Sequence, residues 1–138
     1  MMIVVTGSMD GGPQDYDIPT IPVRSLVMVE HIGQDEISDL KIGDVVAYYS
    51  GSIVIMHRLV EFGDDYLVLK GDANVSSENV PFEDVMGKVV GVSPILGQIF
   101  YFIKSSPILV MGAFLCVVIM AYSLRAILRI LSDKEESQ

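Results

Sequence analysis

The chain has no tryptophan, a single cysteine and only two histidines among its 138 residues. With one cysteine no intrachain disulfide can form, so the folded part must be stable through its core alone. Basic residues are also few: nine Lys or Arg stand against eighteen Asp or Glu, a formal net charge of −9. This balance argues against a nucleic acid as partner, because phosphate binding depends on clustered basic side chains.

The sequence also lacks the patterns that hold cofactors. No group of His, Cys and carboxylate residues has the spacing of metal ligands, and no glycine-rich phosphate loop is present. We therefore expect no cofactor and no metal. The lone Cys116 lies within an apolar stretch, where a thiol behaves as a small hydrophobic group.

That apolar stretch is the longest in the chain. Residues 108–124 carry no formal charge, and the helical composition continues to residue 131. A bilayer is spanned by about 20 residues. We therefore expect a transmembrane helix over residues 105–131 and a short tail over residues 132–138.

The basic residues around this stretch predict its orientation. Arg125, Arg129 and Lys134 lie toward its C-terminal side, whereas Lys104 alone precedes it. Positive residues favour the cytoplasmic side of a membrane helix. We expect a protein of the cell membrane with a cytoplasmic tail and an extracytoplasmic body.

The body, residues 1–104, is predicted to be a single, mainly β domain. Turn residues separate short runs of strand composition, which are residues 3–5, 25–30, 44–49, 53–60, 66–70 and 85–92. Ser50-Gly51-Ser52 and Gly63-Asp64-Asp65 have the composition of hairpin turns. Residues 10–22 have no periodicity and are expected to form a loop.

Three polar residues occur at the ends of these strands. Ser8 follows the first run, His57 ends the apolar part of the fourth, and Asp72 follows the fifth. A serine hydroxyl is a weak nucleophile at neutral pH, so it needs a base and an acid that orients the base. Each residue alone is more typical of a turn or a strand. His31 has no such neighbours and is expected to face solvent.

Five motifs in this order resemble the type I signal peptidases of the archaeal and endoplasmic-reticulum branch, over most of residues 3–131. They are Thr6-Gly7-Ser8-Met9, Gly43-Asp44-Val45-Val46, Ile55-Met56-His57-Arg58-Leu59-Val60, Lys70-Gly71-Asp72 with Asn74, and Gly87-Lys88-Val89-Val90-Gly91. The resemblance implies a small β-rich peptidase domain with Ser8 as nucleophile. It implies His57 as general base, because this branch uses histidine where the bacterial branch uses lysine.

The resemblance leaves two candidates for the acid. The family pattern has Gly-Asp and, six positions later, a second aspartate that is usually taken as the catalytic one. Here the first position is Asp72 and the second is Glu78. A glutamate can orient an imidazole but is one methylene longer. Asp72 is equally typical of a residue that caps its own turn.

The function implied is that of a membrane-bound serine endopeptidase that removes N-terminal signal peptides. Its partners would be secretory preproteins and the lipid membrane, and accessory subunits stay unassigned. An extended substrate would add as a strand beside residues 44–49 or residues 3–5. Backbone amides near Ser8 would have to stabilise the oxyanion.

Two other functions stay open. A self-cleaving, repressor-like peptidase uses a lysine base and needs no membrane helix, so His57 and the apolar stretch argue against it. A catalytically inactive, membrane-tethered β-domain that binds partners is favoured by Glu78 at the acid position. It is also favoured by the short segment before Ser8, where the family usually has a membrane helix. We expect the sequence to be truncated or misassigned at its N-terminus.

Overall fold

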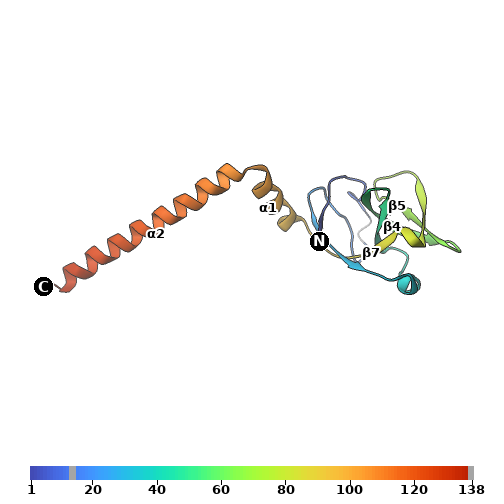
Figure 1. Cartoon of the computed structure of the whole chain (residues 1–138), viewed down its shortest axis with the longest axis horizontal. Coiled ribbons are helices and arrows are strands. Elements are labelled where there is room, and N and C mark those ends of the chain that lie inside the picture. Colours follow the sequence, from blue (N-terminus) through green and yellow to red (C-terminus); the bar gives the residue numbers. More distant parts are fainter. Residues whose placement is uncertain (13–14, 137–138) are drawn as a thin grey trace. The chain divides into compact units, whose positions relative to one another are not determined.

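The computed structural model describes residues 1–12 and 15–136, with side chains up to residue 129. The chain divides into two compact units, residues 1–99 and the residues from 100 onward. The first unit contains a seven-stranded antiparallel sheet and the second is helical (Figure 1). The expected mainly β body with a C-terminal apolar helix is confirmed.

The strands follow the order β1-β2-β7-β3-β4-β5-β6 across the sheet, and neighbouring strands are antiparallel. Their bounds are β1 Met2–Ile3, β2 Leu26–His31, β3 Val45–Ser50, β4 Ile53–Phe62, β5 Tyr66–Lys70, β6 Ser77–Pro81 and β7 Val85–Ser93. From β3 to β6 the chain forms a meander, in which each strand pairs with the next.

Six of the strands match predicted runs, with two differences. The first strand is shorter than expected: beyond Ile3, the Val4 amide still donates to the Ser25 carbonyl (3.0 Å) outside a regular strand. The sequence analysis missed β6, because Ser77-Glu78-Asn79-Val80-Pro81 contains one apolar strand former and a proline. As an edge strand, β6 tolerates that composition.

Short turns set the register of the meander. Ser50 pairs with Ile53, so the β3–β4 loop has only Gly51 and Ser52 between paired residues. Gly51 has φ 62°, a left-handed conformation that glycine adopts without steric cost. The second predicted turn is also present, where the Gly63 amide donates to the Tyr66 carbonyl (2.8 Å).

The helices are η1 (Gln34–Asp39), η2 (Phe82–Asp84), α1 (Pro94–Ser105) and α2 (Pro107–Glu136). The sequence analysis predicted α2 but not α1. A proline at the first helical position begins α2, immediately after the single residue Ser106. Within α2, Pro107–Arg129 has a mean hydropathy of 2.3 and is long enough to cross a membrane.

Residues 10–12 and 15–22 contain no regular helix or strand, as expected, and residues 13–14 lie outside the described part.

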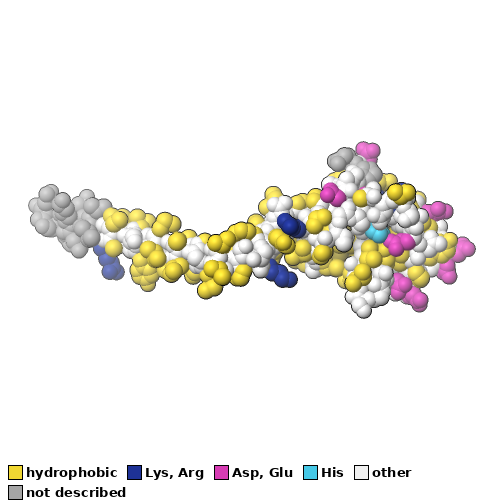
Figure 2. Space-filling model, turned by 90° about the horizontal axis from the view of Figure 1, so that it is seen from above, with side chains coloured by type: hydrophobic (Ala, Val, Ile, Leu, Met, Phe, Trp, Pro, Cys, Tyr) yellow, Lys and Arg dark blue, Asp and Glu magenta, His cyan; other side chains and the backbone are white. Residues whose placement is uncertain are grey.

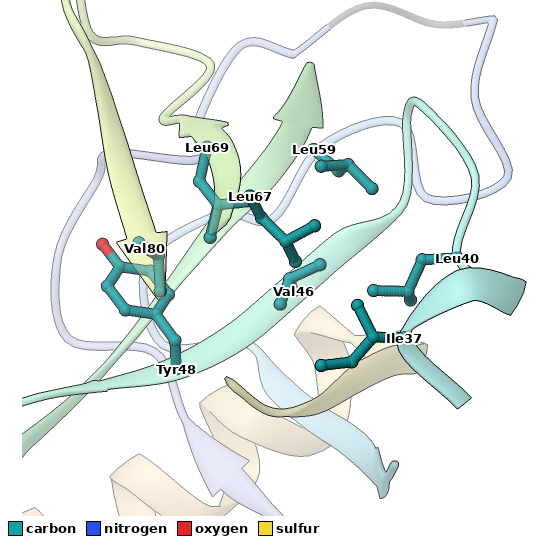
Figure 3. Packing of buried hydrophobic residues seen from close by; sticks show 8 residues of the cluster. All are labelled: Ile37, Leu40, Val46, Tyr48, Leu59, Leu67, Leu69 and Val80. Atoms are coloured by element: carbon teal, nitrogen blue, oxygen red, sulfur yellow. The ribbon is translucent and has the colours of Figure 1, made fainter. Parts of the chain in front are cut away.

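Two apolar clusters fill the sheet unit, and β3 separates them. Neighbouring residues of a strand point to opposite faces, so Val45 packs in one cluster and Val46 in the other. Figure 3 shows the second cluster, which consists of Ile37, Leu40, Val46, Tyr48, Leu59, Leu67, Leu69 and Val80. Acidic side chains lie on the outside of this unit, whereas apolar side chains cover α2 as far as it is coloured (Figure 2).

The centre of the second cluster is expected to dominate stability. Leu69 is fully buried, so Leu69→Ala should lower the free energy of unfolding by about 2–5 kcal/mol, through lost apolar burial and the cavity left behind. Urea unfolding of the full chain in detergent, followed by circular dichroism, measures the change. Val75→Ala, at a site that is 98% exposed, is the control and should leave the midpoint unchanged. Equal midpoints for both variants would contradict this account of the core.

Candidate active site

Two adjacent residues of β4, His57 and Arg58, are buried and point to opposite faces of the sheet. His57 lies on the face of Leu59, toward the cluster of Figure 3, and Arg58 lies on the face of Met56, toward the other cluster. Buried polar groups need partners. Each of the two side chains is paired with a different carboxylate.

The partner of His57 is Glu78 on β6. His57 Nδ1 contacts Glu78 Oε1 directly. The strand register explains this contact: Leu59 on β4 pairs with Leu69 on β5, and Leu69 pairs with Glu78 on β6. Because residues opposite one another share a face, Glu78 lies on the same face as His57.

A third side chain joins this pair. The hydroxyl of Tyr48 on β3 donates to Glu78 Oε1 and lies 3.3 Å from His57 Nδ1. Strands β4 and β5 separate β3 from β6, which in a flat sheet would place Tyr48 and Glu78 at least about 14 Å apart. Twisting and curling of the sheet bring them into contact.

Tyr48 remains protonated in this environment. Burial raises the pKa of its hydroxyl, and the hydrogen bond to Glu78 and the negative charge of that carboxylate raise the pKa further. Its proton therefore stays available for the hydrogen bond to Glu78 throughout the neutral and mildly basic range.

The partner of Arg58 is Asp72, just beyond β5. Arg58 Nε lies 2.8 Å from Asp72 Oδ1, and one terminal nitrogen lies 2.6 Å from Oδ2, so the pair is bidentate. The two side chains are only 3% and 4% exposed. Arg58 also donates to the carbonyls of Gly43 (2.8 Å) and Pro19 (3.4 Å), and it lies over the ring of Tyr16. The two acids considered from the sequence thus occupy different positions: Glu78 contacts His57, and Asp72 pairs with Arg58.

Ser8 lies in a turn that backbone hydrogen bonds hold in place. The Asp10 amide donates to the Gly7 carbonyl (3.1 Å), and the Ile21 amide donates to the Met9 carbonyl (3.0 Å). The loop after β5 reaches the nucleophile candidate itself, because the Ala73 amide donates to the Ser8 carbonyl (2.9 Å). A Cβ atom at Gly71 would lie 2.9 Å from the same carbonyl oxygen. Glycine therefore permits this close approach.

Ser8 and His57 line one groove, with a volume of about 350 Å³. Its other lining residues, all apolar except Thr6, are Met2, Ile3, Val4, Val5, Thr6, Met9, Ile21, Ile53, Val54, Ile55 and Met56. Strand β4 pairs with β5 only from Arg58 onward. The preceding residues of β4 therefore border the groove with an edge that β5 does not cover.

The groove changes one expectation about substrate binding. The expectation that a substrate strand adds beside residues 44–49 is wrong, because β3 already pairs with β4 on one side and with β7 on the other. Residues 3–5, the second expected location, do line the groove. Within the described residues, no three His, Cys, Asp or Glu are placed to hold a metal ion.

Comparisons with known proteins find similarity to signal peptidase catalytic subunits. The chain is 29% identical over 122 residues to the signal peptidase complex catalytic subunit sec11 of Sclerotinia sclerotiorum, and 28% identical over 122 residues to that of Chaetomium globosum. This chain resembles signal peptidase catalytic subunits. Each match covers 78% of the chain and 65% of the relative, so the chain spans less than two thirds of these relatives. No family model and no solved structure matches the chain.

Sequence reasoning missed two residues of this site, Tyr48 and Arg58, although the sequence contains a signal for each. The two-residue turn after β3 fixes the register that brings Tyr48 diagonal to His57. Arg58 is a charged residue beside His57 in an apolar strand, which indicates a buried partner. His31, by contrast, is exposed at the end of β2, as expected.

Removing the partner of Arg58 should destabilise the fold. Asp72→Asn leaves a buried guanidinium without its countercharge, so the free energy of unfolding should fall by about 3–5 kcal/mol. Urea unfolding of the full chain in detergent measures it, with the exposed Asp64→Asn as matched control. Glu78→Gln should cost much less, because the Glu78 side chain is 44% exposed. Wild-type stability of Asp72→Asn would show that the ion pair of Arg58 and Asp72 does not stabilise the fold.

Proposed function

We propose that this chain is a membrane-bound serine endopeptidase that removes N-terminal signal peptides from secretory preproteins. The observation that carries the proposal is the contact between His57 Nδ1 and Glu78, with Ser8 on the same groove as His57. The likeness to two signal peptidase catalytic subunits supports the choice of substrate.

In this proposal Glu78, not Asp72, is the acid of the catalytic set. A carboxylate at Nδ1 favours the tautomer that carries its proton there, which leaves Nε2 free to accept a proton. Asp72 is fully engaged by Arg58 and has a structural role. The longer side chain of glutamate is accommodated because Glu78 reaches His57 from β6 across the curled sheet.

The reaction would follow the acyl-enzyme route. Ser8 Oγ attacks the scissile carbonyl carbon while His57 Nε2 takes its proton, and the imidazolium then protonates the leaving amine as the C–N bond breaks. Water, deprotonated by His57, attacks the acyl-enzyme, and Ser8 recovers its proton. Among the described residues we find no acceptor for the Ser8 amide, which supports this N–H as a donor to the oxyanion.

The substrate would enter the groove as an extended strand. The uncovered edge of β4 beside Ile53–Met56 offers backbone groups for pairing. The apolar lining suits the small residues that end a signal peptide. The apolar helix within α2 would hold the enzyme at the membrane, with Arg125 and Arg129 toward the cytoplasm.

Loss of activity in single variants tests the proposal. Ser8→Ala and His57→Ala should each reduce cleavage of a model preprotein by at least about 10³-fold, because each removes a reacting group. Glu78→Gln should reduce it by about 10³- to 10⁴-fold through loss of the orienting charge. The full chain in membranes, with and without an added N-terminal membrane helix, is assayed for the size of the product.

Matched controls are Ser38→Ala on η1 and His31→Ala, which are exposed and outside the groove. Both should cleave like wild type. Wild-type cleavage by Ser8→Ala would overturn the serine mechanism. No cleavage by the wild-type chain in either form would instead favour the inactive, partner-binding domain.

A further inference from the structure

Tyr48 occupies a position that core packing alone does not explain. It is 2% exposed, and its ring belongs to the apolar cluster around Val46 and Leu69. In Figure 3 the ring lies beside Val80, and the hydroxyl oxygen points away from the other labelled side chains. A phenylalanine would fill the same space. The hydroxyl, by contrast, is costly to bury unless it is hydrogen-bonded.

The partner of that hydroxyl is the oxygen that contacts the histidine. Tyr48 donates to Glu78 Oε1, the atom that also meets His57 Nδ1. The hydroxyl is 3.3 Å from Nδ1 itself, so the three polar atoms converge on one point. Tyr48 does not line the groove shared by Ser8 and His57. It is therefore placed to act on Glu78 and not on a substrate in that groove.

A hydrogen bond that fixes the carboxylate matters more for Glu78 than it would for a buried acid. Its side chain is 44% exposed and belongs to an edge strand, so water competes for its carboxylate. A glutamate also has one more rotatable bond than an aspartate to immobilise. Burial raises the pKa of Tyr48, and Glu78 raises the pKa further. The hydroxyl therefore keeps its proton and donates at any pH at which His57 acts as a base.

We propose that Tyr48 is a positioning residue, which holds the Glu78 carboxylate against His57 Nδ1 and so keeps Nε2 free as the proton acceptor. The inference rests on the proposed function, since it assigns a role within the same catalytic set. Tyr48 acts only through Glu78, and it gives the exposed glutamate a fixed orientation.

A double-mutant cycle tests this dependence. Tyr48→Phe keeps the ring but removes the donor, so kcat should fall about ten- to a hundredfold, the effect of losing a hydrogen bond to a charged group. KM should stay unchanged, because Tyr48 is outside the groove. In a Glu78→Gln background, the same substitution should change single-turnover cleavage by less than about threefold, because the charge it orients is gone.

The matched control is Tyr49→Phe, the neighbouring residue of β3, which is half-exposed and points to the opposite face. It should cleave like wild type. Wild-type kcat in Tyr48→Phe, with Ser8→Ala inactive, would overturn the inference and leave the proposed function intact. Equal losses with and without Glu78→Gln would also overturn it, because Tyr48 would then act through packing.

A readout without substrate separates the inference from the proposed function. The chain has two histidines, so nitrogen-15 labelling with His31→Gln isolates the ring signals of His57. The Nδ1 proton should be protected from exchange in wild type, and Tyr48→Phe should accelerate its exchange at least about tenfold, by the same loss of a hydrogen bond. Unchanged exchange would overturn the inference even if Ser8→Ala abolished cleavage.

Discussion

The buried ion pair of Arg58 and Asp72 is the interaction on which the arrangement of the site depends. One guanidinium joins β4, the loop after β5, the Gly43 turn and the segment that contains Pro19. The loop with Asp72 continues to Ala73, whose amide holds the Ser8 carbonyl. The position of Ser8 relative to β4 is therefore connected to this pair through two hydrogen-bonded steps.

Two adjacent residues of β4, His57 and Arg58, form different kinds of charged contact on opposite faces of the sheet. Arg58 faces inward to a charge pair that is closed to water, and His57 faces a carboxylate that stays partly exposed. A buried pair of full charges favours a fixed geometry, because breaking it leaves an uncompensated ion. The role proposed for His57 requires instead that the charge of its ring change during the reaction. The alternation of the strand keeps the two requirements apart.

Local pattern was enough to predict most strands, two of the three connections of the meander and the apolar helix, because turn residues and apolar runs are signals within a few positions. Strand β6 was missed, since Glu78, Asn79 and Pro81 give it the composition of a loop. Which of Asp72 and Glu78 contacts His57 could also not be predicted from local sequence. It depends on the register of three strands and on the curl of the sheet, and both are set by packing over the whole unit. The contact of Tyr48 with Glu78 could not be predicted for the same reason.

The uncovered edge of β4 has a consequence for selectivity. Backbone pairing along an edge is open to almost any sequence, provided that the incoming chain is extended. A helix cannot pair in this way, because its amides and carbonyls are already hydrogen-bonded to one another. Such an edge discriminates by conformation first and by side chain second. In the proposed reaction, a polypeptide whose apolar core is helical would present only its extended flank here, so the boundary between the two conformations would mark the bond to be cut.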